Sequence, residues 1–353
     1  MNQDGVFTRG VTAMAVQDPE MQVAVGVGKN VKRNPRKAAR QAANMTKKRA
    51  SVLDEYHNKV LFTFVSGAII PRVPFIGTVN NVNSAVLGKL LSRVGMRLAA
   101  LLGTGVGKEE TFVIELSKHF EDYCIFGGSS VDDYSCLDNY VFLNETPLKN
   151  STVILIFGIN KNVYMNWVLG AKPTDRKFTI TKTAYDDRII VSINGKSAKK
   201  QFLEEISKIS EERFKMIEPA FYYKTSDYFP IGFEDNPMYT TGVGAIYGKE
   251  LLLGYKALGR KGVLLSVSGK EILESVDELL KGFKSEKAFA FVYSSGIRLN
   301  MLSHKAWMLK EKYEKYFDGL PYLVVYPMNN YFKEPGERII LGVYSANIIS
   351  VGK

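Results

Sequence analysis

The sequence predicts a mixed α/β (α+β) protein of two related halves, each a mixed β-sheet covered by helices. Three observations support this prediction. Apolar runs of strand length alternate with amphipathic patterns that carry helix caps. The same order of strands and helices occurs twice. Between the two copies, residues 176–193 predict a β-hairpin, which a helix from Ser197 to about Ser210 follows. These two elements are expected to join the halves.

The first copy begins with an apolar run at residues 22–28, which predicts a strand. Asn34 and Pro35 then predict the start of a helix that continues to about residue 50, because Asn caps helices and Pro fits their first position. Residues 60–65 predict the next strand, and Ser84 is the expected cap of a helix ending near Leu102. Further strands are expected at residues 123–126, 140–143 and 152–157.

The second copy is predicted to begin with a strand at residues 262–267, corresponding to residues 22–28. Ser268 and Glu271 form a capping box for a helix to about residue 283. A strand at 288–293, a helix around 303–317, a strand at 322–326 and closing strands at 338–344 and 346–351 follow. The matching order predicts an internal duplication.

The basic charge is concentrated in one part of the sequence. The chain has 353 residues and a net charge of +11. Residues 21–108 contain fifteen Lys and Arg residues and two acidic ones, so this segment carries +13. Such an asymmetry concerns partners more than fold. Two helices present the basic residues, which are expected to bind an acidic protein, RNA or the ribosome: Lys32, Arg33, Arg36, Lys37, Arg40, Lys89, Arg93 and Arg97. A solvated helix face is the alternative interpretation.

Several functional classes lack their signature in the sequence. The N-terminal residues do not resemble a secretory signal, and no apolar stretch is long enough to cross a membrane, so a cytoplasmic protein is expected. Residues 103–108 resemble a phosphate-binding loop, but Leu102 and Glu109 occupy positions where that motif needs Gly and Ser or Thr. The standard catalytic motifs are absent, so no enzymatic activity and no resident cofactor are expected. An enzyme that uses Ser295 or the Asp132–Asp133 pair is the remaining alternative.

Two loops contain the candidate ligand-binding residues. Gly127, Gly128 and Ser129 follow a predicted strand, where consecutive glycines can expose backbone N–H groups to an anion. Asp132 and Asp133 stand just beyond and could hold an ammonium group or Mg²⁺; a tight turn with solvated acids is the alternative.

Ser295 and Arg298 follow the strand at 288–293, where α/β sheets commonly bind ligands. Arg298 could clamp a carboxylate, or it could be a structural arginine. Asn329 lies in the loop of the second copy that corresponds to the turn beginning at Gly127 in the first copy. His304 could in principle ligate haem, although a polar residue at a helix start is the simpler interpretation.

The chain resembles the FIST sensory family. The residues that carry this resemblance are an Ala-rich helix after Val25–Gly28, the Gly127–Gly128–Ser129 turn, the Asn194–Gly195–Lys196–Ser197–Ala198 link, and Ser294–Arg298. The resemblance implies an N-terminal domain at residues 1–197 and a C-terminal domain at 198–353. It also implies an intracellular sensor that binds a small ligand, amino-acid-like or anionic, and signals through a separate partner. Binding of nucleic acid or the ribosome through residues 21–108 is the alternative function. The ligand and the oligomeric state stay open.

Overall fold

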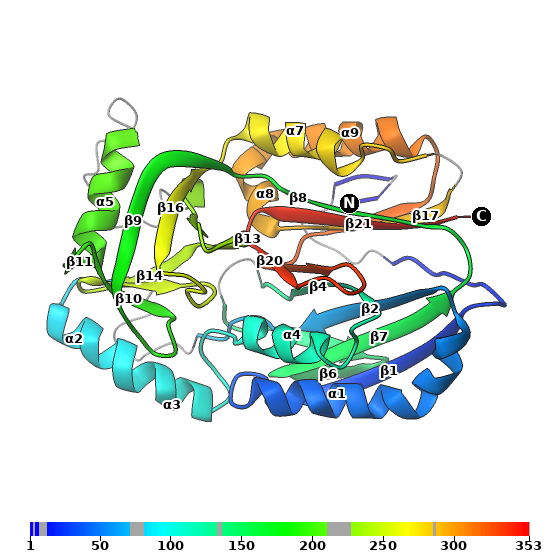
Figure 1. Cartoon of the computed structure of the whole chain (residues 1–353), viewed down its shortest axis with the longest axis horizontal. Coiled ribbons are helices and arrows are strands. Elements are labelled where there is room, and N and C mark those ends of the chain that lie inside the picture. Colours follow the sequence, from blue (N-terminus) through cyan, green and yellow to red (C-terminus); the bar gives the residue numbers. More distant parts are fainter. Residues whose placement is uncertain are drawn as a thin grey trace.

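The computed structural model describes residues 1–2, 4–6, 13–70, 81–132, 136–209, 227–284 and 287–352. Two β-sheets pack face to face, and helices cover their outer faces, which gives four layers over the right-hand part of Figure 1. The mixed α/β prediction is therefore confirmed. Within the described residues, no helix is both long enough and apolar enough to cross a membrane.

The first four-stranded unit is built from the N-terminal part of the chain. Strand β7 (Ser151–Ile159) pairs antiparallel with both β1 (Gln22–Lys29) and β2 (Asn58–Val65), and β2 pairs parallel with β4 (Cys124–Ser129). Helices α1 (Pro35–Ala50) and α4 (Glu109–Ser117) cover its outer face. The short 3-10 helix η1 (Ser51–Glu55) follows α1. Because both faces of β2 are buried, its sequence is almost continuously apolar instead of alternating.

The second four-stranded unit has the same order of strands. Strand β21 (Ser345–Gly352) pairs antiparallel with β8 (Val163–Leu169) and β17 (Lys287–Ser294), and β17 pairs parallel with β18 (Tyr322–Val325). Helices α7 (Gly269–Leu279) and α9 (Trp307–Phe317) cover its outer face. Phe62 of β2 meets Phe291 of β17 between the sheets, with ring centroids 5.2 Å apart.

The two units agree with the predicted duplication, but one correspondence was wrong. In the second unit the position of β1 is taken by β8, whereas residues 262–267 form most of β16 (Lys261–Ser266), which pairs with β9 (Lys172–Ala184) and β12 (Ile231–Phe233). Strand β8 precedes residue 197, yet it completes the C-terminal sheet. The division of the chain at residue 197 stays a prediction. Because β8 pairs with β21, the N-terminal part contributes a strand to the sheet of the C-terminal part.

The first sheet extends from β4 into a strongly curved region on the left of Figure 1. The strands that continue it are β19 (Asn330–Lys333), β20 (Ile340–Gly342), β13 (Asn236–Thr241), β12, β16, β9, β10 (Ile189–Ile193), β15 (Glu250–Leu253), β14 (Val243–Tyr247) and β3 (Asn81–Val82), with β11 (Lys196–Ser197) beside β10. Helix α5 (Ala198–Ile209) and the continuous helical segment α2 (Ala85–Leu90), η2 (Leu91–Gly95, a π-helix) and α3 (Met96–Leu101) pack on this region. Strands β5 (Tyr140–Leu143) and β6 (Thr146–Lys149) form a separate two-stranded sheet.

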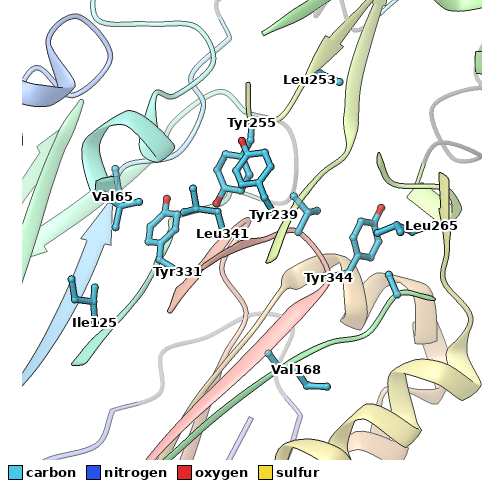
Figure 2. Close-up of a cluster of buried hydrophobic side chains, with 14 of the residues drawn as sticks. Val65, Ile125, Val168, Tyr239, Leu253, Tyr255, Leu265, Tyr331, Leu341 and Tyr344 are labelled. Carbon is cyan, nitrogen blue, oxygen red and sulfur yellow. The ribbon is translucent and has the colours of Figure 1, made fainter. Parts of the chain in front are cut away.

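Buried tyrosines connect the first unit to the curved region (Figure 2). Tyr239, Tyr255 and Tyr331 form a row, with ring centroids 5.8 and 6.5 Å apart. They share one apolar core with Val65 and Ile125 of the first unit. Such large side chains contribute much of the stability of the junction, because each removes a large apolar area from water.

Local signals in the sequence account for several elements. The Asn34 side chain accepts a hydrogen bond from the Lys37 N–H, as expected for a helix cap. The predicted hairpin is β9–β10, which turns at Tyr185–Asp187 with positive φ angles, and Asn194–Gly195 forms the second turn. Helix α5 then begins next to the predicted start at Ser197.

Two predicted loops prove to be regular structure. Gly127 and Gly128 lie inside β4, paired with β2 and β19, because both glycines continue the ladder of hydrogen bonds. The segment containing Arg298 is helix α8 (Gly296–Leu302), which ends before the 3-10 helix η3 (Ser303–Lys305). The predicted helix at 303–317 corresponds to η3 and α9, and α8 is an additional helix directly before them.

Strand β1 and helix α1 approach closely because both present small residues. A Cβ atom at Gly28 would lie 2.2 Å from the Ala38 carbonyl oxygen and 2.9 Å from Thr152 Cγ2. We therefore expect Gly28→Ala to lower the free energy of unfolding by about 2–4 kcal/mol, since strand and helix must separate. Denaturant unfolding measures this loss. Gly242→Ala is the matched control, since a Cβ there meets nothing within 4 Å; equal losses in both variants would contradict the packing argument.

Candidate functional site

A cavity of about 540 Å³ lies where the first unit meets the C-terminal part of the chain. Its walls come from the loop after β2, the residues leading into α4, strands β14 and β15, helix α8 and the loop before β19. The lining residues are mostly apolar: Ala68, Ile70, Val106, Gly107, Glu109, Cys136, Asp227, Tyr228, Gly242, Val243, Gly244, Ala245, Leu252, Gly254, Ile297, Asn300, Met301, Met328, Asn329 and Val343. Largely apolar walls with a few polar groups are typical of small-molecule sites.

Glu109, the first residue of α4, places a buried carboxylate at this wall. Only 3% of the residue is exposed. Its carboxylate folds back over Gly107, where any side chain would collide with it, since a Cβ would lie 1.8 Å from Oε1. Burial raises the pKa of Glu109, the neighbouring Glu110 raises it further, and Lys32 and Arg188 act in the opposite direction. Taking a carboxylate out of water favours its protonated form unless a cation compensates.

The adjacent Glu110 forms a fully buried ion pair with Arg188. Arg188 Nη2 donates to Glu110 Oε1, and Arg188 Nη1 donates to the Gly254 carbonyl oxygen at 2.6 Å. Arg188 belongs to the turn between β9 and β10, and Glu110 belongs to α4. This interaction therefore ties the first unit to the curved region beside the cavity.

Lys32 corrects one prediction about the basic surface. Its side chain is fully buried, and Nζ donates to the Ser66 carbonyl oxygen at 3.3 Å. Burial lowers the pKa of Lys32, while the negative charge of Glu109 raises it. Lys32 is thus part of a buried charged cluster with Glu109, Glu110 and Arg188 and is unavailable to an external partner.

Asp227 is the second carboxylate of the cavity wall. Burial raises its pKa from 3.8 to about 7. Its backbone oxygen accepts a hydrogen bond from Tyr344 Oη at 2.6 Å. A carboxyl group with this pKa changes its charge near neutral pH, so the charge of the cavity depends on pH.

The first predicted ligand loop is a packed strand. A Cβ atom at Gly127 would lie 2.4 Å from the Thr63 carbonyl oxygen, and one at Gly128 would lie 2.5 Å from Pro327 Cβ. The glycines therefore allow the neighbouring strands to approach closely, and their backbone groups take part in the sheet. Ser129 is buried and its N–H donates to the Asn329 carbonyl oxygen at 3.3 Å.

The second predicted ligand loop is also occupied by protein contacts. Arg298 is fully buried in α8, where it donates to Ser275 Oγ at 2.7 Å and to backbone carbonyl oxygens of Ile272 and Tyr344. It is a structural arginine and does not line the cavity. Ser295 Oγ donates to the Met328 carbonyl oxygen at 3.4 Å.

The segment Pro327–Asn329 lies between the two predicted ligand loops, at Gly127–Ser129 and Ser295–Arg298. The Met328 N–H donates to the Ser129 carbonyl oxygen at 2.9 Å, and the Gly296 N–H donates to the Pro327 carbonyl oxygen at 2.7 Å. The two predicted ligand loops are thus close to each other, but the segment Pro327–Asn329 packs between them. Of the predicted ligand-binding residues in the described part of the chain, Asn329 alone lines the cavity.

Asp132 stabilises its own loop. Its carboxylate accepts N–H hydrogen bonds from Cys136, Leu137 and Asp138 at 2.6–2.8 Å. These contacts occupy the group that was expected to meet a ligand ammonium or Mg²⁺. Asp133 lies outside the described residues.

The remaining predicted basic residues lie at the surface on two separate helical segments. Arg33, Arg36, Lys37 and Arg40 are exposed at and before α1, where Arg40 lies 3.9 Å from Glu115. Lys89 and Arg97 are exposed on α2 and α3, whereas Arg93 forms an ion pair with Glu250 at 2.7 Å. Their binding of RNA or of an acidic partner stays a prediction.

The residue considered for haem ligation, His304, lies away from the cavity. It is exposed on η3. Across the described ranges, no three His, Cys, Asp or Glu side chains gather to hold a metal ion. Burial raises the pKa of the Cys136 thiol at the cavity wall to about 11, which keeps it protonated and unreactive.

Glu109, Asp227 and Asn300 line the cavity but were not among the residues predicted from the sequence. For Glu109 a signal existed: two acids directly after a glycine-rich segment are typical of the first turn of a helix, where they interact with the helix dipole. For Asp227 and Asn300 we find no comparable local signal.

Replacing only one partner of the Glu110–Arg188 pair should strongly destabilise the protein. We expect Glu110→Gln to lower the free energy of unfolding by about 3–5 kcal/mol, since Arg188 is left buried without a counter-charge. The double variant Glu110→Gln/Arg188→Met should lose clearly less than the sum of the losses in the single variants Glu110→Gln and Arg188→Met. Denaturant unfolding of the four proteins completes the cycle. Additive losses would mean that the two residues do not interact energetically.

Asp227 predicts a pH-dependent stability. The folded protein keeps this proton up to about pH 7, whereas the unfolded chain releases it near 3.8. Stability therefore falls as the pH rises through this window. We expect Asp227→Asn to remove this loss, so that its advantage over the parent grows from about pH 4 to about pH 7 and is constant above. Unfolding curves across this range test it; an advantage independent of pH would disprove the assignment.

Comparison with protein families matches residues 1–196 to the FIST N domain. The match covers more than half of the chain and includes β1, α1, β2, β4, β7 and the β9–β10 hairpin. The corresponding assignment of residues 198–353 to a C-terminal domain of the same family stays a prediction. A search of curated proteins found no match.

Proposed function

The chain belongs to the FIST family, which is associated with sensing small ligands in signal transduction, and we propose that its cavity binds a small, largely apolar amine. The main support for this proposal is the buried carboxylate of Glu109 in the mainly apolar wall of the cavity. A ligand ammonium would compensate for the lost hydration of this carboxylate and would hold it in the ionised form.

Other lining groups favour the same class of ligand. Asp227 supplies a second acidic group, and Asn300 and Asn329 supply amides that can hydrogen bond to a carbonyl or hydroxyl group. Among the described lining residues there is no Lys, Arg or His. Of the two kinds of ligand expected from the sequence, an amino-acid-like ligand or amine therefore fits this cavity better than a purely anionic one.

The signal would leave the cavity through its curved wall. Strands β14 and β15 line the cavity with Val243, Ala245 and Leu252. Ala245 and Leu252 also share a buried apolar cluster with Met96 of α3, and Leu87 of α2 packs against this cluster. A ligand that changes this wall would act on the helices. The exposed basic residues of α1 supply no specific observation that favours RNA over other acidic partners.

Ligand binding should depend on the charge of Glu109. In a thermal-shift screen, we expect primary amines and hydrophobic amino acids to raise the unfolding temperature more than acids or alcohols of the same carbon skeleton. For the best amine, calorimetry should show that Glu109→Gln weakens affinity about ten-fold or more. Glu204→Gln, on the exposed face of α5, is the matched control. The proposal fails if acids bind as well as amines, or if Glu109→Gln binds like the parent.

A further inference from the structure

The helical segment α2–η2–α3 presents a stripe of large apolar side chains to solvent. Each is between 55% and 82% exposed, although apolar side chains of this size are usually buried. The members, called the leucine stripe below, are Val86, Leu90, Val94, Leu98, Leu101 and Leu102.

The π-helix keeps this stripe on one face. Residues spaced by four drift around an α-helix, because one turn takes only about 3.6 residues. The wider turn at Leu91–Gly95 absorbs one extra residue and so offsets part of that drift midway along the segment. Val86, Leu90, Val94 and Leu98 therefore follow one another along a nearly straight line.

The opposite face of the segment is fixed to the curved sheet. Gly88 touches the backbone at Tyr247 and Gly248, where a Cβ would lie 2.6 Å from the Gly248 nitrogen. Glu250 accepts hydrogen bonds from Ser92 Oγ at 2.9 Å and from Arg93 Nη2 at 2.7 Å. With these polar contacts buried, the segment cannot roll its stripe inward without breaking them.

The charge beside the stripe indicates an acidic occupant. Lys89 and Arg97 are exposed on α2 and α3, and no Asp or Glu occurs between residues 85 and 102. A second copy of the chain is disfavoured, because pairing two such segments would bring like charges together. Opposite charges on a partner would instead be attracted to Lys89 and Arg97 beside the stripe.

We propose that the leucine stripe is the docking site for an amphipathic helix of a partner protein, with Asp and Glu beside its apolar face. Aliphatic ridges at four-residue spacing fit the grooves of another helix. Helices that lie on bilayers commonly insert Trp or Phe, and no aromatic residue occurs between residues 85 and 102. The proposal stands on exposure and charge alone and does not depend on the cavity ligand.

Two designed peptides test it. Both are helices of about 20 residues with Leu at the i, i+3, i+4 and i+7 positions; one has Glu beside the apolar face and the other has Lys. Fluorescence anisotropy should show that the parent protein binds the acidic peptide at least about ten-fold more tightly than the basic one. Leu98→Glu should weaken the acidic peptide about ten-fold or more. Phe142→Glu, a change at an equally exposed residue of β5, should leave affinity unchanged.

Four results would overturn the proposal. The first is equal affinity for both peptides, or no binding of the acidic one below about 1 mM. The second is unchanged binding by Leu98→Glu. The third is co-sedimentation of the parent, but not of Leu98→Glu, with phosphatidylserine vesicles in the absence of peptide binding, which would indicate a lipid surface. The fourth is a dimer in sedimentation velocity that Leu98→Glu abolishes, which would identify a second copy as the occupant.

Discussion

Strand β4 holds the molecule together, because it is the boundary between the first unit and the curved region of the same sheet. It pairs parallel with β2 on one side and antiparallel with β19 on the other. Gly127 and Gly128 make both approaches possible, since side chains there would collide with Thr63 and Pro327. The tyrosine row, the Glu110–Arg188 pair and the cavity all lie beside this junction. If β4 shifted, each of them would lose its geometry.

The elements with strong local signals could be predicted from the sequence. Asn34, Ser84 and Ser268 each cap a helix, and Asn194–Gly195 forms a turn with both φ angles positive, because these residue types satisfy local backbone requirements. Strand pairing was harder. The apolar pattern of residues 262–267 does not reveal that β16 joins β9 and β12 while β8 completes the second sheet, since both strands are simply apolar.

The candidate site was predicted poorly for a related reason. Consecutive glycines indicate close backbone approach, and the sequence does not say whether a ligand or another strand approaches; here it is a strand. Arg298 has neutral protein partners that lie far from it in the chain. Glu109, by contrast, meets Lys32 and Arg188 through tertiary contacts only. Burial of a charge is a property of the assembled fold, so residue type and spacing alone do not disclose it.

The position of β8 has a consequence for how this chain folds during synthesis. All four strands of the unit β1–β7–β2–β4 have been synthesised once residue 159 has left the ribosome. Strand β8, which contains Val168, cannot pair until Ala346 and the rest of β21 have been synthesised. Contacts that close such long loops form late, and domains that depend on them expose apolar surface in the meantime. The nascent chain therefore spends the second half of its translation with a finished sheet followed by an unpaired strand, the kind of intermediate on which chaperones act.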